Sequence, residues 1–296
     1  GDNLKRIFFS VFLIYGAYII VFTIILYFLG AQDVIRTGAF VIDTITGGYQ
    51  PSLEQFQQYL SIPIRVCIVI LMFVGSVNFI LNYHLFTLKL KKALTREILL
   101  YLLIIAVGTI LIISLTGRGP LTSLFHVVSM TSSTGYDYIN IPLLNDTTRY
   151  VLILLMILGG CGFSMAGGIR MFRIISFFKS IKQNIKGILI REKVIQEDNK
   201  KQKETNNLEE FSALVAIVLF VATLFIFSII LSTMGISFDK AFFEVSSALT
   251  TNGISTGATN VLMPVAYKWL LITAMIIGRI EIIPILIALS PYKRKE

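Results

Sequence analysis

The chain has 296 residues, of which 55% are hydrophobic and only 15% are charged, and its mean hydropathy is +0.79. Soluble domains carry about 25% charged residues, so this composition excludes an ordinary soluble protein and predicts an integral membrane protein. The net charge of +9 does not indicate nucleic-acid binding, because the basic residues gather beside apolar runs. These basic clusters are Lys89–Arg96, Arg170–Lys203 and Lys293–Lys295.

Six apolar runs are long enough to cross a bilayer, which takes about 20 residues of helix. They are Ile7–Leu29, Ile62–Leu85, Ile98–Leu115, Tyr150–Phe178, Phe211–Met234 and Val261–Leu289. If Lys5 and Arg6 face the cytoplasm, six spans place all three basic clusters and the C-terminus on that same side. The sequence therefore predicts an all-α, multi-pass protein with cytoplasmic basic loops.

The runs divide the chain into three units and one linker. Residues 1–92, 93–191 and 211–296 are each expected to hold a span, a short helix with a polar loop, and a second span. Residues 192–210 carry both signs of charge without apolar periodicity, and this pattern predicts a partly helical cytoplasmic linker.

The three segments between paired spans share one pattern. They read "GAFVIDTITGGYQPS" (38–52), "LFHVVSMTSSTGYDY" (124–138) and "AFFEVSSALTTNGIST" (241–256). Each has a short, partly apolar helix, then Thr or Ser, then a glycine followed by a large side chain. A pattern that recurs at the same place in three units indicates an internal repeat.

A helix of about ten residues is too short to cross a bilayer, so each segment is expected to enter the membrane and return. Non-helical backbone at membrane depth is tolerated where it lines a water-filled path, and rings of carbonyl and hydroxyl oxygens bind cations there. The candidate filter residues are Thr46, Gly47, Gly48, Ser133, Thr134, Gly135, Thr251, Asn252 and Gly253. The alternative is a set of ordinary extracellular loops.

The fourth run contains "GGCGFSMAGG", residues 159–168. Glycine costs about 0.8–1 kcal/mol relative to alanine inside a helix, so this density predicts a helix broken by an irregular intramembrane loop. The alternative is a helix-packing face of small residues. The candidate loop residues are Gly159, Gly160, Gly162, Ser164, Gly167 and Gly168.

Arg279 lies inside the sixth run, where a charge needs a partner or a cavity. Glu281 would point away from it on a helix, so the free carbonyls of the glycine-rich loop are the expected partner. The alternative is an arginine whose side chain extends to the inner membrane boundary. Glu244, within the third short helix, is expected to hydrogen-bond to filter backbone or to neighbouring helices.

The motifs "TITGGY", "TSSTGY" and "TTNGIST", with "ILGGCGFSMAGGIR" (157–170) and "MIIGRIEIIPILIALSP" (275–291), resemble the Trk/Ktr/HKT family of potassium and sodium transport proteins, in its Trk-type membrane subunit. That family has four span–pore helix–span repeats around one pore, and this chain is expected to contain repeats two, three and four. The resemblance implies potassium uptake, with Na⁺ as a second candidate ion, and no enzymatic activity or covalent cofactor. It also implies that residues 159–168 gate the pore and that Arg279 contacts them.

The resemblance further implies a homodimer of membrane subunits in the plasma (inner) membrane and a cytoplasmic ring of nucleotide-binding regulatory subunits. The basic stretch Arg170–Lys203 is the expected docking face for that regulator. The competing hypothesis is a secondary transporter that couples its substrate to an ion through broken helices. A membrane enzyme is disfavoured, because neither His84 nor His126 has a ligand or nucleophile partner at a suitable spacing.

Overall fold

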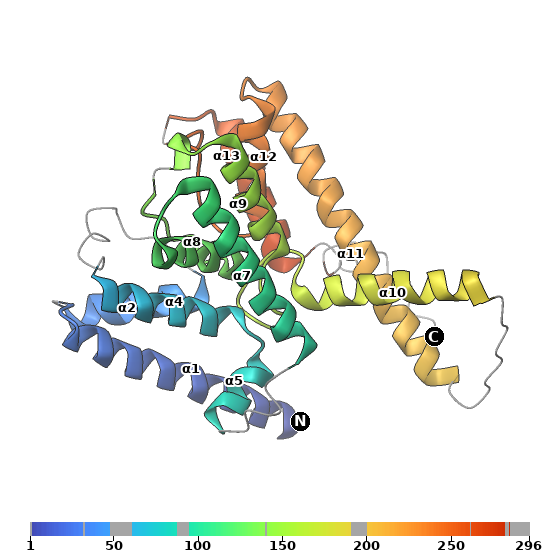
Figure 1. The fold of residues 1–296 in the computed structure, drawn as a ribbon, viewed down its shortest axis with the longest axis horizontal. Helices are drawn as coiled ribbons and strands as arrows, with labels where there is room; N and C mark the ends of the chain where they lie inside the picture. Colours follow the sequence, from blue (N-terminus) through green and yellow to red (C-terminus); the bar gives the residue numbers. More distant parts are fainter. Residues whose placement is uncertain are drawn as a thin grey trace.

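The computed structural model describes residues 2–31, 33–47, 61–87, 95–139, 141–190, 200–260, 262–281 and 284, and within these ranges all regular structure is helical (Figure 1). The α-helices are α1 (Asp2–Phe28), α2 (Val34–Thr46), α4 (Ile62–Ser76), α5 (Phe79–Phe86), α7 (Arg96–Thr116), α8 (Pro120–Ser132), α9 (Asp146–Leu158), α10 (Met171–Ile190), α11 (Lys200–Thr233), α12 (Phe238–Leu249) and α13 (Val265–Ile280), and one 3₁₀ turn spans Ile141–Leu143. The all-α fold class predicted from the sequence is confirmed.

Three short helices, α2, α8 and α12, occupy equivalent places in the chain. Each packs against the long helix before it and the helix after it: α2 against α1 and α4, α8 against α7 and α9, and α12 against α11 and α13. Neighbouring units join in the same way each time, because α8 also packs on α4 and α12 also packs on α9. The three short helices therefore lie in chain order within one continuous arrangement.

Three helical segments in the described chain are long and apolar enough to cross a membrane: Phe9–Phe28, Arg96–Thr116 and Glu210–Thr233. Most of their residues are not buried within the protein, and large apolar side chains such as Leu103, Ile110 and Ile229 are exposed. Water would penalise this exposed apolar surface, whereas lipid tails would not. The chain is therefore a membrane protein, with the first helix of each unit facing lipid.

The second helix of each unit ends early, which corrects the expectation that Ile62–Leu85 and Val261–Leu289 are continuous spans. The second run divides into α4 and α5, which are bent by 120°, and the sixth run leaves the helix after Ile280, at Glu281 with φ 68°. Residues 282–283 and 285–296 lie outside the described residues.

A common sequence precedes the three breaks: "LMFVGS", "LMILGG" and "AMIIGR", with glycines at 75, 159 and 278. At all three the glycine meets backbone so closely that a side chain would not fit, and at two of them this backbone is the end of a short helix. A Cβ on Gly75 would lie 2.3 Å from the Ile45 carbonyl oxygen, and one on Gly278 would lie 2.0 Å from that of Leu249. Helices α4 and α13 thus pack against the end of their own unit's short helix, whereas a Cβ on Gly159, after α9, would lie 2.1 Å from the Gly167 carbonyl oxygen.

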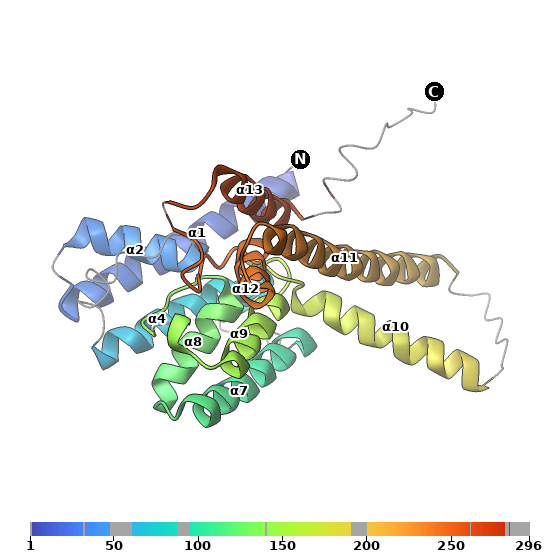
Figure 2. The same ribbon diagram turned by 90° about the horizontal axis from the view of Figure 1, so that it is seen from above.

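The longest helix extends beyond its membrane segment. Helix α11 begins at Lys200, so the second half of the expected linker 192–210 is helical, while residues 191–199 lie outside the described residues. Helices α10 and α11 pack together and project away from the other helices (Figures 1 and 2). An ion pair of 2.9 Å between Lys179 Nζ and Glu210 Oε1 joins them.

Candidate functional site

The loops that follow α8 and α12 have the same backbone shape. Ser133 and Thr251 have φ of 59° and 56°, and two residues later Gly135 and Gly253 have φ of 70° and 78°. Left-handed backbone is uncommon for residues other than glycine, so its recurrence at matching positions is a strong sign of a repeated loop. The second and third candidate filter segments are therefore structurally equivalent.

The first and second candidate filter segments are in contact. The Thr134 hydroxyl donates to the carbonyl of Thr44 at 3.3 Å, and the hydroxyls of Thr44 and Tyr136 are 3.1 Å apart. The Tyr136 ring stacks on Phe40, with centroids 5.4 Å apart. Because Thr44 and Phe40 lie on α2, the second loop is held by the first short helix. Gly48 and Tyr49, of the first segment, lie outside the described residues.

The second and third segments are also in contact. The Asn252 amide donates to the carbonyl of Met130 at 3.2 Å. At Gly135, a Cβ would lie only 1.7 Å from the carbonyl oxygen of Asn252, so the two backbones touch and only glycine fits. Gly253 has no such neighbour, and its Cβ position is open. The described loops therefore adjoin in chain order and bring hydroxyl, amide and carbonyl oxygens together.

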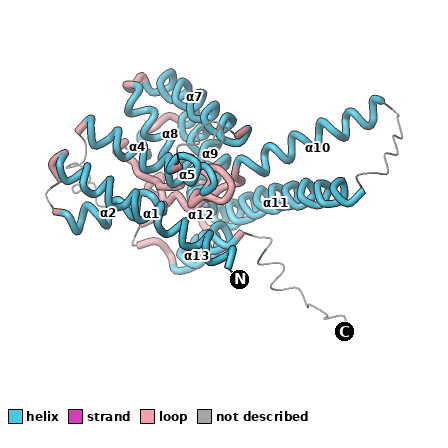
Figure 3. The backbone as a smooth tube through the Cα atoms, turned by 90° about the horizontal axis from the view of Figure 1, so that it is seen from below, coloured by secondary structure: helices cyan, strands magenta, loops and turns pink. Residues whose placement is uncertain are grey.

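Residues 159–170 form an irregular loop, two residues longer than the expected 159–168, since α9 ends at Leu158 and α10 begins at Met171. Figure 3 shows the non-helical segments gathered between the helices near α5, α9 and α12. The N–H of Gly167 donates to Ser133 Oγ at 2.8 Å, and a Cβ on Gly167 would lie 2.4 Å from the Thr250 carbonyl oxygen. This loop, the candidate intramembrane loop, is thus packed directly against the second and third candidate filter segments.

The same loop is anchored to the break between α4 and α5. The N–H groups of Cys161 and Met165 donate to the carbonyls of Ser76 and Gly75, at 2.9 and 3.1 Å. These carbonyls are free because α4 ends there, and a helix leaves its last acceptors unsatisfied. The early end of α4 therefore supplies the acceptors that hold the intramembrane loop.

Arg279 contacts the intramembrane loop, as the sequence predicted. Its Nη1 donates to the carbonyl of Met165 at 3.1 Å. Close packing of Gly278 on the end of α12 fixes where the next side chain starts. The guanidinium thereby reaches the loop, although the Arg279 side chain itself is exposed.

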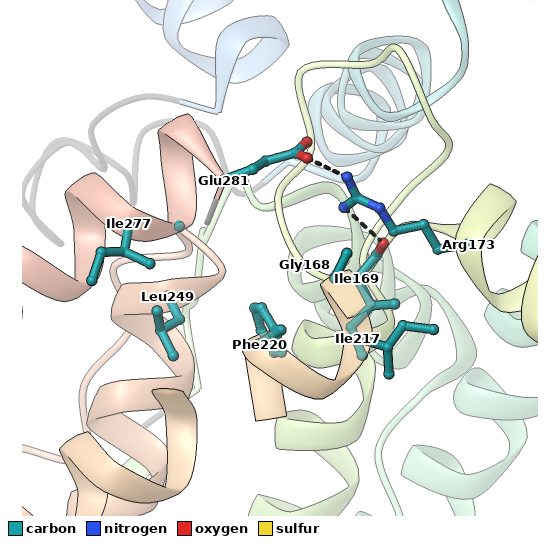
Figure 4. A pocket seen from close by; sticks show the side chains of 10 residues that line it. Gly168, Ile169, Arg173, Ile217, Phe220, Leu249, Ile277 and Glu281 are labelled. Carbon is teal, nitrogen blue, oxygen red and sulfur yellow. Dashed lines mark hydrogen bonds and ion pairs between the residues drawn. The ribbon is translucent and has the colours of Figure 1, made fainter. Parts of the chain in front are cut away.

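A second contact between α13 and the loop was not anticipated. Glu281 binds two arginines at the start of α10. Its Oε1 is 2.9 Å from Nη1 of Arg170, which directly precedes α10, and its Oε2 pairs with Arg173 on that helix. Figure 4 shows Glu281 reaching Arg173, whose guanidinium also contacts the Ile169 carbonyl at 3.5 Å. All three side chains are largely buried, so each charge depends on its partner.

The residues around this ion pair are mostly apolar. Leu249, Ile277, Ile217 and Phe220 line a small cavity of about 30 Å³ beside it (Figure 4). The sequence shows an acidic residue and two arginines within apolar runs, but it does not indicate that they pair, because Glu281 and Arg173 lie 108 positions apart. The basic residue nearest to Glu281 in the sequence is Arg279, two residues away, and it is not the partner.

Glu244 on α12 bonds to the chain that leaves the third candidate filter segment, at Ser255 and Thr256. Its Oε1 accepts from the Thr256 N–H at 2.7 Å, from the Thr256 hydroxyl at 2.7 Å and from the Ser255 hydroxyl at 2.8 Å. The carboxyl is buried, at 3% exposure. Three donors compensate its loss of water.

Long apolar helices, each followed by a short helix, with oxygen-rich loops that adjoin at the short-helix ends, define an all-helical membrane protein. The family model described as cation transport protein, TrkH, matches residues 95–293. The chain belongs to this TrkH cation transport family.

Similar proteins carry related descriptions. An uncharacterised cation transporter, MJ1485 of Methanocaldococcus jannaschii, is 29% identical over 93% of this chain and 57% of its own length. The Trk system potassium uptake protein TrkI of Halomonas elongata is 27% identical over 90% of this chain and 57% of its own length. TrkG of Escherichia coli, also a Trk system potassium uptake protein, is 29% identical over 85% and 54%. The chain thus spans a little over half the length of these relatives.

The crystal structure of the potassium transporter TrkH from Vibrio parahaemolyticus has the same fold. It superposes with a TM-score of 0.80 over 98% of this chain and 65% of the other, at 17% sequence identity. At that identity the likeness concerns the fold alone.

Proposed function

We propose that this chain supplies the ion-conducting part of a potassium uptake membrane subunit. The observation that carries the proposal is the contact of successive filter segments, which gathers backbone and side-chain oxygens at the ends of α2, α8 and α12. Oxygens of this kind replace the hydration shell of a monovalent cation. K⁺ is the proposed cargo because relatives bear the name potassium uptake protein, and Na⁺ is the second candidate ion.

The filter in this proposal consists of three segments, one from each unit. The units are residues 1–92, 93–191 and 211–296, joined by the linker 192–210, and a fourth unit completes the pore. The filter residues are Thr46, Gly47, Gly48, Ser133, Thr134, Gly135, Thr251, Asn252 and Gly253.

The intramembrane loop is the proposed gate. Its contacts with Ser133 and Thr250 support a position at the filter segments, and Arg279 and Glu281 hold it from α13. The gate residues are Gly159, Gly160, Gly162, Ser164, Gly167, Gly168 and Arg279. In this mechanism the loop obstructs the path, Arg279 adds a positive charge near it, and cations pass when the loop moves away.

The proposed assembly is a homodimer in the plasma (inner) membrane, with the basic segments in the cytoplasm. A ring of nucleotide-binding regulatory subunits would bind the projecting pair α10 and α11. Movement of α10 would act on the gate through the ion pairs of Arg170 and Arg173 with Glu281.

Flux measurements on the full-length protein in liposomes test this function. The intact protein should carry K⁺ down its gradient, and a variant without residues 159–168 should carry more. A protein without K⁺ or Na⁺ flux would contradict the proposal, as would a well-assembled deletion variant with unchanged or lower flux. The alternative, an ion-coupled secondary transporter, requires that an imposed H⁺ or Na⁺ gradient drive K⁺ uphill.

A further inference from the structure

The chain that leaves each filter segment poses a hydrogen-bonding problem. If the filter carbonyls point at the ion path, the backbone N–H groups of the same strand point away from it, into the protein. A buried N–H group without an acceptor is costly, so these groups need partners. The return strands have no neighbouring strand in the described chain to provide them.

In two units a side chain of the short helix provides the acceptor, at the same position in each. His126 precedes Gly135 by nine residues, and Glu244 precedes Gly253 by nine. Each accepts from the backbone N–H three residues after its glycine. Tyr138 N–H donates to His126 Nε2 at 3.4 Å, and Thr256 N–H donates to Glu244 Oε1 at 2.7 Å.

The hydrogen bonds of His126 define its acceptor. Its Nδ1 lies 2.7 Å from the carbonyl oxygen of Thr122, which can only accept, so Nδ1 carries the proton. The neutral ring then presents an unprotonated Nε2 to Tyr138. The imidazole is buried, at 1% exposure, and packs against the Tyr138 ring with centroids 4.6 Å apart.

The sequence of the first unit fits the same rule, because it lacks both the acceptor and the donor. The residue nine before Gly48 is Ala39, which has no acceptor, and the residue three after Gly48 is Pro51, which has no N–H. In the sequence, an acceptor residue therefore stands nine positions before the glycine in the two units that have an N–H three positions after it, and not in the unit that has proline there.

We propose that His126 and Glu244 are positioning residues of the filter: each supplies the hydrogen-bond acceptor that fixes the return strand and thereby the carbonyls that discriminate K⁺ from Na⁺. This inference rests on the proposed function. It assigns one chemical requirement, an acceptor, to a position that holds different side chains.

Two substitutions at residue 126 separate the acceptor from the ring. His126→Gln keeps an acceptor oxygen and loses the ring, whereas His126→Phe keeps a ring beside Tyr138 and loses the acceptor. Glu244→Gln and Glu244→Leu form the corresponding pair on α12. The matched controls are His84→Gln and His84→Phe, because His84 lies on α5, which packs mainly on α1.

The measurement is the ratio of K⁺ to Na⁺ flux for the full-length protein in liposomes, with assembly checked by size-exclusion chromatography. His126→Phe and Glu244→Leu should lower this ratio about tenfold, because an unpaired buried N–H displaces the strand. Both Gln variants and both controls should stay within about twofold of the unmodified protein.

Three results would overturn the inference. A normal ratio in an assembled His126→Phe variant would show that the acceptor is dispensable. An altered ratio in His126→Gln would show that the imidazole ring, and not the acceptor, sets the K⁺ to Na⁺ ratio. This second test remains available if the His126→Phe variant does not assemble. Absence of cation flux in the unmodified protein would overturn the inference together with the proposed function, so the two failures are distinguishable.

Discussion

The N–H of Gly167 donates a hydrogen bond to Ser133 Oγ at 2.8 Å, so the intramembrane loop is bonded directly to a residue of the second filter segment. The Ser133 hydroxyl, which accepts this hydrogen bond from the loop, is also a candidate ion ligand. In the proposed mechanism a closed loop and a bound ion would share this oxygen, and loop movement would leave it to the ion alone.

Ser133→Ala should favour loop opening. It removes the acceptor of Gly167 and costs the closed state about 0.5–1.5 kcal/mol, so K⁺ flux should rise roughly two- to tenfold. Ser133→Thr is the control, because it keeps the hydroxyl and Thr251 shows that threonine fits the equivalent left-handed position. Equal flux in the Ala and Thr variants would contradict the proposed competition.

Arg279→Ala should raise K⁺ flux about tenfold or more. The substitution removes a hydrogen bond from a charged donor, worth about 1.5–3 kcal/mol, together with a positive charge beside the path. Arg279→Lys should give an intermediate flux, because an ammonium keeps the charge and loses the planar fork. Unchanged flux in an Ala variant that assembles normally would show that this contact does not hold the gate.

Glu281 and Arg173 should act as one unit. Glu281→Gln and Arg173→Gln each break the same ion pair. The loss of unfolding free energy in the double variant should therefore be smaller than the sum of the two single losses, by about 1 kcal/mol or more. Thermal unfolding in detergent and basal K⁺ flux both report this coupling. Lys179→Gln, which breaks the more exposed pair with Glu210, should change stability by less than about 1 kcal/mol.

Two of the filter glycines, Gly135 and Gly253, should differ in their tolerance of alanine. Gly135→Ala adds a methyl group that would lie 1.7 Å from the Asn252 carbonyl oxygen, on top of the strain of a left-handed backbone. Gly253→Ala carries only the strain, which costs about 1–2 kcal/mol, because nothing lies within 4 Å of its Cβ position.

Unfolding temperature and flux measured on both variants test this difference. Gly135→Ala should lower both by clearly more than Gly253→Ala. A ranking in the opposite order would mean that the filter segments do not adjoin as described.

The sequence alone predicted those features that depend on the residues of a single segment. The length of an apolar run fixed the membrane helices α1, α7 and α11, because burial in lipid acts on every residue of the run. Glycine density predicted the loop at 159–168, since each glycine weakens a helix locally. The Arg279 contact followed from the same logic, because a charge within an apolar run must find acceptors.

Tertiary structure decided what depends on two distant segments. The apolar run from Ile62 carries no local signal strong enough to reveal its 120° bend, which occurs where Gly75 meets the end of α2 and the freed carbonyls bind the loop. The pairing of Glu281 with Arg170 and Arg173 likewise depends on how α13 and α10 approach one another. Periodicity reports the environment of a residue along its own helix, whereas the identity of its partner is set by the packing of helices that are far apart in the sequence.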